Sequence, residues 1–244
     1  AIQLQSMFMM FSTAISGVFL PRVTAMVAKE NNEQEISNLF VRTGRLQYII
    51  MAFILSAFIV FGKPFIQLWA GAGYEDAYYI CLLFFIPLTI PLIQNLGITI
   101  LQARNQMKFR SLLYIVIALA SLGLSILLAK SYGGYGCALS TSLALFIGQG
   151  LVMNMYYHRK QHLDMVKFWK EIIKMSLVPV CFVVAGLMVI NSAAFSIMSI
   201  LNFVGLGLLF TVAYGFAFWY FGMNKDEKDL ISQPIGLLIA RIRR

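Results

Sequence analysis

The sequence predicts an all-α protein, a polytopic bundle of seven transmembrane helices. Three observations support this: 60% of the 244 residues are hydrophobic, only 12% are charged, and the mean hydropathy is +0.79. Soluble domains have about 45–50% apolar and about 25% charged residues, because their surfaces face water. With 14% aromatic residues, the chain is also too apolar to stay disordered in water. The composition therefore excludes both classes and indicates a membrane protein.

Each helix is predicted from a window without charges. A crossing needs about 20 residues, because roughly 30 Å of hydrocarbon is spanned at about 1.5 Å per residue. Five windows supply one helix each. The sixth, residues 175–224, is long enough to cross twice, and Asn191-Ser192 is the expected turn. The predicted helices lie near residues 2–26, 39–61, 77–102, 111–130, 134–157, 173–191 and 195–221.

The basic residues predict the orientation of the bundle. Of the 19 Lys and Arg residues, only Lys63 and Lys130 fall on the side opposite to the rest. By the positive-inside rule, the first end is outside and the C-terminus is cytoplasmic. The net charge of +9 is then a marker of topology, and nucleic acid is not an expected partner.

Residues 158–174 are predicted to form a separate basic amphipathic helix in the cytoplasmic leaflet. Lys160, Lys167 and Lys174 recur on one face, and Met165 and Trp169 lie on the other. Its role is either a plain anchor or a regulatory lipid site. The sequence is thus divided into residues 1–157 with five spans, the helix 158–174, a helix pair over 175–221 and a cytoplasmic tail over 222–244.

Enzymatic and metal-binding motifs are missing. All ten acidic residues are expected in loops, so no carboxylate pair is expected to face a membrane cavity. His158 and His162 have the i, i+4 spacing of metal ligands, but no third ligand is evident. The three cysteines have no CxxC spacing. We therefore expect neither an enzyme nor a metal or cofactor.

Polar residues within the helix near 77–102 are the strongest indication of function. At 100° per residue, two prolines and three amides share one face. Prolines free backbone carbonyls, which in lipid must bind neighbours or line a wet cavity. We expect this helix to bend along a polar passage, although amides that join helices would give the same pattern. The residues are Pro87, Pro91, Gln94, Asn95 and Gln102.

The helix near 2–26 has a weaker polar stripe, formed by Gln5, Ser12 and Ser16. Packing between helices explains such a stripe as well as transport does. Arg22 follows Pro21 near the inner end of this helix, and Arg104 follows the helix near 77–102. Each arginine is a candidate for binding an anionic head group, with a simple positive-inside anchor as the alternative.

Four stretches carry a resemblance to a known family. They are Leu20-Pro21-Arg22 with the following residues to Phe40, Gly62-Lys63-Pro64 to Ala77, Leu101-Gln102-Ala103-Arg104-Asn105 to Lys108, and Gly133-Gly134-Tyr135-Gly136 to Thr141. In their order and spacing, the chain resembles the C-terminal half of a polysaccharide flippase of the oligosaccharide exporter group (Wzx type). Its superfamily, MOP, also holds MATE multidrug exporters and lipid II flippases.

The resemblance implies a fold of two six-helix lobes around a central cavity. This chain would be one lobe of that MATE-like inverted V, with two extra C-terminal helices. Because Ala1 is not an initiator methionine, we expect a missing N-terminal lobe of the same protein as a partner. The helices near 2–26 and 77–102 would line the cavity, with Gln5, Ser12, Ser16, Arg22, Gln94, Asn95, Gln102 and Arg104 as its residues and Pro87 and Pro91 at the bend.

The function implied is a flippase in the bacterial cytoplasmic (inner) membrane. It would move an undecaprenyl-diphosphate-linked oligosaccharide repeat unit, without covalent change, for O-antigen, capsule or exopolysaccharide synthesis. The lipid bilayer, the lipid-linked oligosaccharide and a polysaccharide polymerase are the expected partners.

Three other functions stay open at this point. A cation-coupled MATE-type drug exporter needs a carboxylate within the membrane, and this half is expected to have none. A membrane-embedded polysaccharide polymerase needs catalytic residues outside, where the sequence offers only Lys63, Glu75, Asp76 and Lys130. A purely structural subunit would leave the amides near Asn95 unexplained.

Overall fold

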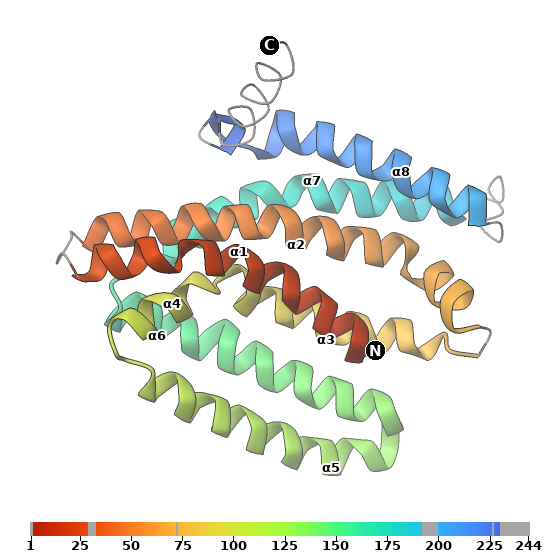
Figure 1. The fold of residues 1–244 in the computed structure, drawn as a ribbon. Helices are drawn as coiled ribbons and strands as arrows, with labels where there is room; N and C mark the ends of the chain where they lie inside the picture. The colour runs from red at the N-terminus through yellow and green to blue at the C-terminus, as the bar shows by residue number, and fades with distance from the viewer. Residues whose placement is uncertain (1, 29–32, 72, 192–199, 226, 230–244) are drawn as a thin grey trace, which may run out of the picture.

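The computed structural model describes residues 2–28, 33–71, 73–191, 200–225 and 227–229. These residues form helices and no strand (Figure 1), which confirms the predicted all-α class. The elements are α1 (Ile2–Ala28), α2 (Glu33–Ala70), α3 (Asp76–Ile93), α4 (Leu96–Ala103), α5 (Lys108–Leu145), η1 (Phe146–Met153), α6 (Asn154–Lys160), α7 (Met165–Asn191), α8 (Ile200–Ala217) and η2 (Phe218–Gly222).

Five segments of the described chain are long and apolar enough to cross a membrane. Most residues of these segments point outward, and large apolar side chains such as Leu119 and Leu127 are more than half exposed. Water would not tolerate such a surface, whereas lipid does. This exposed apolar surface is therefore typical of membrane-spanning helices. The five segments are Glu33–Ala70, Asp76–Ile93, Lys108–Lys160, Met165–Ile190 and Asn202–Gly222.

The long segment Lys108–Lys160 reverses its direction within α5, as Figure 1 shows. The turn is at Gly133, whose φ of 54° and ψ of −130° are not helical. Glycine adopts a positive φ without the steric penalty of a Cβ. The structure thus gives two antiparallel arms at the place where the sequence predicts separate helices near 111–130 and 134–157.

The helix predicted near 77–102 is interrupted, as its prolines led us to expect. α3 ends at Ile93 and α4 begins at Leu96. At the break, the Gln94 N–H donates to the carbonyl of Pro91, three residues back, at 3.3 Å. Proline lacks the N–H that continues the helical ladder, so two prolines within α3 weaken the helix just before the break.

The separate amphipathic helix predicted over 158–174 is wrong. α6 ends at Lys160, residues 161–164 are not helical, and α7 begins at Met165 and continues into the apolar span. The cause is a cap: Asp164 Oδ1 accepts the Lys167 N–H at 2.9 Å, which satisfies a donor of the first turn. The Asp164 N–H itself donates to Ser37 Oγ of α2 at 2.9 Å.

Two further predictions, the turn at Asn191-Ser192 and the tail over 222–244, lie only partly within the described residues. α7 is described as far as Asn191, and Ser192 of the expected turn Asn191-Ser192 lies outside the described residues, so this turn stays a prediction. Of the tail 222–244, the structure describes residues 222–225 and 227–229.

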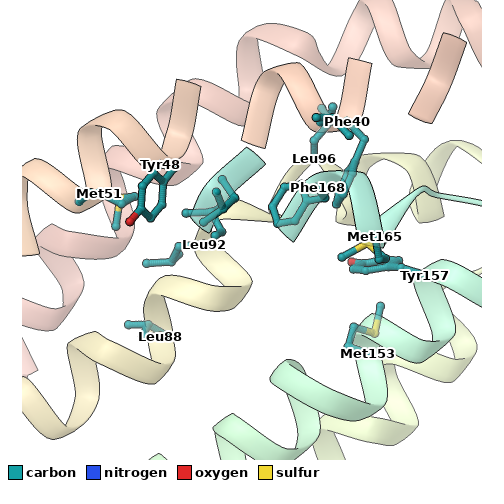
Figure 2. Close-up of a cluster of buried hydrophobic side chains, with 14 of the residues drawn as sticks. Phe40, Tyr48, Met51, Leu88, Leu92, Leu96, Met153, Tyr157, Met165 and Phe168 are labelled. Carbon is teal, nitrogen blue, oxygen red and sulfur yellow. The ribbon is translucent and has the colours of Figure 1, made fainter. Parts of the chain in front are cut away.

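The buried core lies where α2, α4, α6 and α7 meet. Phe40 and Phe168 are fully buried, with ring centroids 5.1 Å apart, and Tyr157 lies 5.9 Å from Phe40. Figure 2 shows these rings beside Leu96 and Met153. This packing fixes the break between α3 and α4 against α7, and so it fixes the polar groups at the break.

Most of the basic residues lie toward one end of the bundle. Figure 1 places the end of α1, the start of α2, α4 and α6 at this end, and the turn of α5 at the opposite end. Arg104 and Lys108 flank the α4–α5 connection, and Arg159 lies in α6. We call this the basic end.

Candidate functional site

A buried polar cluster joins α1 and α2 to the break between α3 and α4. Ser12 Oγ donates to the carbonyl of Leu92 at 2.6 Å and accepts a hydrogen bond from Asn95 Nδ2 at 3.4 Å. Gln47 of α2 donates from Nε2 to Ser16 Oγ at 2.6 Å and to the Ser12 carbonyl at 3.3 Å. All four side chains are less than 9% exposed. Ser12 of α1 thus binds polar groups of the break, and Gln47 of α2 in turn binds α1.

A second polar cluster lies on the other side of the break. Gln94 Nε2 donates to Asn154 Oδ1 at 2.9 Å, and the same oxygen accepts from Trp169 Nε1 at 2.9 Å. Asn154 Nδ2 in turn donates to the carbonyl of Gly150 at 2.8 Å. One asparagine of α6 therefore connects the end of α3 with the start of α7.

The structure brings together four predicted cavity residues: Ser12, Ser16 and Asn95 in the first cluster and Gln94 in the second. Within the described residues they bind protein atoms, which is the arrangement expected for amides that join helices. Gln5 is half-buried and Gln102 is exposed, and no hydrogen bond of the two clusters involves either of them.

Two amide atoms of the interior have unused hydrogen-bonding capacity. Gln47 Oε1 and Gln149 Nε2 are buried and lack a hydrogen-bond partner within the described residues. A buried polar atom without a partner is costly. One unused acceptor and one unused donor are what hydroxyl groups of a ligand or water would bind.

The structure describes the surroundings of only one of the two arginines predicted to bind an anionic head group. Arg104 pairs with Glu33 at 2.8 Å and donates to the carbonyl and Oε1 of Gln161 at 3.1 and 3.2 Å. The Glu33 carboxylate neutralises Arg104, so this geometry does not favour Arg104 as an anion site. Arg22 belongs to α1, but its side chain lies outside the described part of the structure.

The structure also shows an ionic cluster that the sequence did not predict. Arg45 of α2 contacts Glu227 through Nε–Oε1 at 2.6 Å and Nη2–Oε2 at 3.0 Å, and Glu171 of α7 through Nη1–Oε2 at 2.5 Å. Nη2 also donates to the carbonyl of Gly222 at 3.3 Å. Arg45 and Glu227 are buried. We call these three residues the Arg45 cluster.

The structure contradicts the expectation that all acidic residues lie in loops. Glu33 and Glu35 lie in α2 and Glu171 lies in α7, so the acids are not confined to loops. Glu171 and Glu227 also share one arginine beside a cavity. Buried carboxylates need a paired charge, and the packing of α2 against α7 supplies it.

The cavity next to the Arg45 cluster has a volume of about 740 Å³ and lies toward the basic end. Three cations, Arg42, Arg45 and Lys167, line it together with three carboxylates, so its formal charges cancel. Such a lining can bind polar groups of either sign. The other lining residues are Met26, Glu35, Asn38, Leu39, Val41, Glu171, Asn224 and Glu227.

A metal site does not emerge in the described residues, where no three His, Cys, Asp or Glu side chains are grouped to hold an ion. His158 Nδ1 lies 3.3 Å from the carbonyl of Leu163, and His162 is exposed with a positive φ of 53°. The non-helical link over 161–164 therefore breaks the helical spacing that would place both rings on one face.

Comparisons with protein-family models, with curated proteins and with solved structures give no match to this chain.

Proposed function

We propose that the chain is one lobe of a flippase that moves an undecaprenyl-diphosphate-linked oligosaccharide across the bacterial cytoplasmic membrane. The observation that supports this most is the interruption between α3 and α4. It places the buried amide of Asn95 beside Ser12 of α1, and the buried amide of Gln94 beside Asn154 of α6, within an apolar bundle. Polar groups and a broken helix at membrane depth are typical of transport pathways.

The proposed topology has seven crossings. They are α1, α2, α3 with α4, the two arms on either side of Gly133, α7, and α8 with η2. The basic end is assigned to the cytoplasm by the positive-inside rule. A second lobe, as the family resemblance implies, would close the central cavity against α1 and the α3–α4 pair.

The charge distribution suits an anionic, hydroxyl-rich substrate. A diphosphate arriving from the cytoplasm would meet Arg42 and Lys167, two exposed cations in the lining of the 740 Å³ cavity, and guanidinium and ammonium groups bind phosphate oxygens well. Sugar hydroxyls match the unused groups Gln47 Oε1 and Gln149 Nε2. Rocking of one lobe against the other would expose the path to each side in turn.

A second candidate is a cation-coupled drug exporter, because the Arg45 cluster supplies carboxylates that the sequence did not lead us to expect. Two carboxylates on one guanidinium leave a formal negative charge that a proton or sodium ion could neutralise. Both acids already bind Arg45, and Glu227 Oε2 also accepts the Asn224 N–H at 2.8 Å. This bonding favours a structural role for the pair and ranks the exporter second.

The test is deletion of the gene in cells that make a surface polysaccharide, followed by complementation with the full chain. The proposal predicts loss of surface polysaccharide, accumulation of lipid-linked oligosaccharide and unchanged drug sensitivity. Normal polysaccharide with increased drug sensitivity would support the exporter instead. Single repeat units on the surface without long chains would indicate a polymerase.

A further inference from the structure

A groove between α6 and the first turns of α7 combines an apolar floor with a cationic rim. Its volume is about 780 Å³. Met155 of α6 and Val166 and Ile173 of α7 form the floor, and each is more than half exposed. Arg159, Lys170 and Lys174 are exposed at the rim. The lining includes no carboxylate.

The walls of the groove are joined by hydrogen bonds. Trp169 Nε1 of α7 donates to Asn154 Oδ1 of α6 at 2.9 Å. Leu163, in the link between the helices, is completely buried, and its N–H donates to the carbonyl of Tyr157 at 3.1 Å. The groove is therefore formed by the fold and does not depend on a ligand.

The cations of the rim are available to a ligand. Among the described residues, no carboxylate lies within ion-pair distance of Arg159 or Lys170. Lys174 lies 3.6 Å from Glu171, whose other oxygen is bound to Arg45. Two free positive charges thus lie above an apolar surface.

The apolar floor continues along α7 into the membrane-spanning region. Leu177 and Val180 are more than half exposed and follow Ile173 along the helix, and Met165–Ile190 is one of the segments able to span a membrane. Basic pockets between helices at the cytoplasmic boundary bind anionic lipid head groups, and tryptophan is typical of this boundary. A lipid whose head group binds the rim would have an acyl chain along α7.

We propose that this groove binds an anionic glycerophospholipid of the surrounding bilayer. Arg159 and Lys170 hold its phosphate, Lys174 adds a third positive charge, and one acyl chain follows Val166, Ile173 and Leu177. The charge complementarity and the continuity with the membrane-facing stripe of α7 favour a lipid over a soluble ligand. This site is separate from the amides of the proposed transport path, so either proposal can fail without the other.

Photocrosslinking of lipids tests the site. The full-length protein is reconstituted in phosphatidylcholine vesicles containing a low fraction of phosphatidylglycerol, or of phosphatidylcholine, with a diazirine on one acyl chain. After irradiation and chymotryptic digestion, mass spectrometry maps the crosslinks. The proposal predicts that phosphatidylglycerol labels peptides of residues 150–177 on the order of tenfold more than the phosphatidylcholine probe, because each cation adds to the attraction of the anionic head group.

Two charge variants distinguish the groove from general surface attraction. Arg159→Gln with Lys170→Gln removes two rim charges, and Lys108→Gln with Lys160→Gln removes two charges of the same end that do not line the groove. Only the first pair should reduce phosphatidylglycerol labelling to the level of the phosphatidylcholine probe. Equal labelling by both probes in the native protein, unchanged labelling in the first pair, or an equal loss in both pairs would overturn the proposal.

Discussion

Ser12 Oγ of α1 donates a 2.6 Å hydrogen bond to the carbonyl of Leu92, two residues before the break between α3 and α4. The bond connects residues 80 positions apart in the sequence. It satisfies a carbonyl at a place where the regular helical ladder ends, so α1 stabilises the interruption directly.

Replacing Ser12 with alanine should destabilise the protein by about 1 kcal/mol, the usual size of a lost buried hydrogen bond within a membrane bundle. SDS-induced unfolding of the full chain measures this change. Thr13→Ala is the matched control, because the Thr13 hydroxyl bonds only to Met9 and Met10 of its own helix. Equal effects of both variants would show that the Ser12–Leu92 bond does not stabilise the break.

Loss of Arg45 should have a larger effect. Arg45→Gln leaves Glu171 and the buried Glu227 without their cation, which should cost about 3–5 kcal/mol. Arg42→Gln removes a cation that is exposed and lines the same cavity, and it should change the unfolding free energy little. If unfolding of the two variants is alike, the Arg45 cluster is not a structural connection between α2 and α7.

Gly44 allows α2 to approach α7 closely. A Cβ at this position would overlap the ring of Phe168 and lie 2.9 Å from the carbonyl of Ile93. Gly44→Ala should therefore destabilise the protein by about 1–3 kcal/mol through overpacking. Gly123 of α5 has open space around it, so Gly123→Ala should be neutral in the same unfolding assay, and a comparable loss there would contradict the packing argument.

Glu75 should ionise at lower pH than an ordinary glutamate. Hydrogen bonds from Lys63 and Gln67 stabilise its carboxylate, and these contacts lower its pKa. The contribution of these contacts to the free energy of unfolding is thus complete above the usual glutamate pKa. It is lost as the pH falls through the lower pKa of Glu75 in the folded protein. An infrared titration of native protein minus Glu75→Gln measures the pKa, and an ordinary or raised value would contradict the contact.

The sequence was sufficient to predict the main helices and the bend. Charge-free windows mark apolar helices because lipid excludes charge, and Pro87 and Pro91 mark the break because proline cannot continue the ladder. The cap at Asp164 could also have been recognised, since aspartate directly before Met165 is a typical helix start. The cap was not predicted because the amphipathic periodicity over 158–174 indicated one continuous helix.

The contacts of the polar groups could not be predicted in the same way. Glu171 and Glu227 reach Arg45 across 126 and 182 residues, and no spacing in the sequence brings such positions together. Gln47 is a weak indication of such a contact, because a single amide at the start of an apolar run needs a hydrogen-bond partner. That Ser16 provides this partner follows only from the packing of α1 on α2.

The most direct test of the flippase proposal measures which leaflet holds the lipid-linked oligosaccharide. Sealed spheroplasts with and without the gene are treated with periodate, which does not cross the membrane, and the oligosaccharide is then extracted. The proposal predicts that periodate oxidises a fraction of the lipid-linked oligosaccharide when the full chain is present and that the pool is protected in the deletion. An equally oxidised pool in the deletion would show that the substrate crosses without this protein and would contradict the proposal.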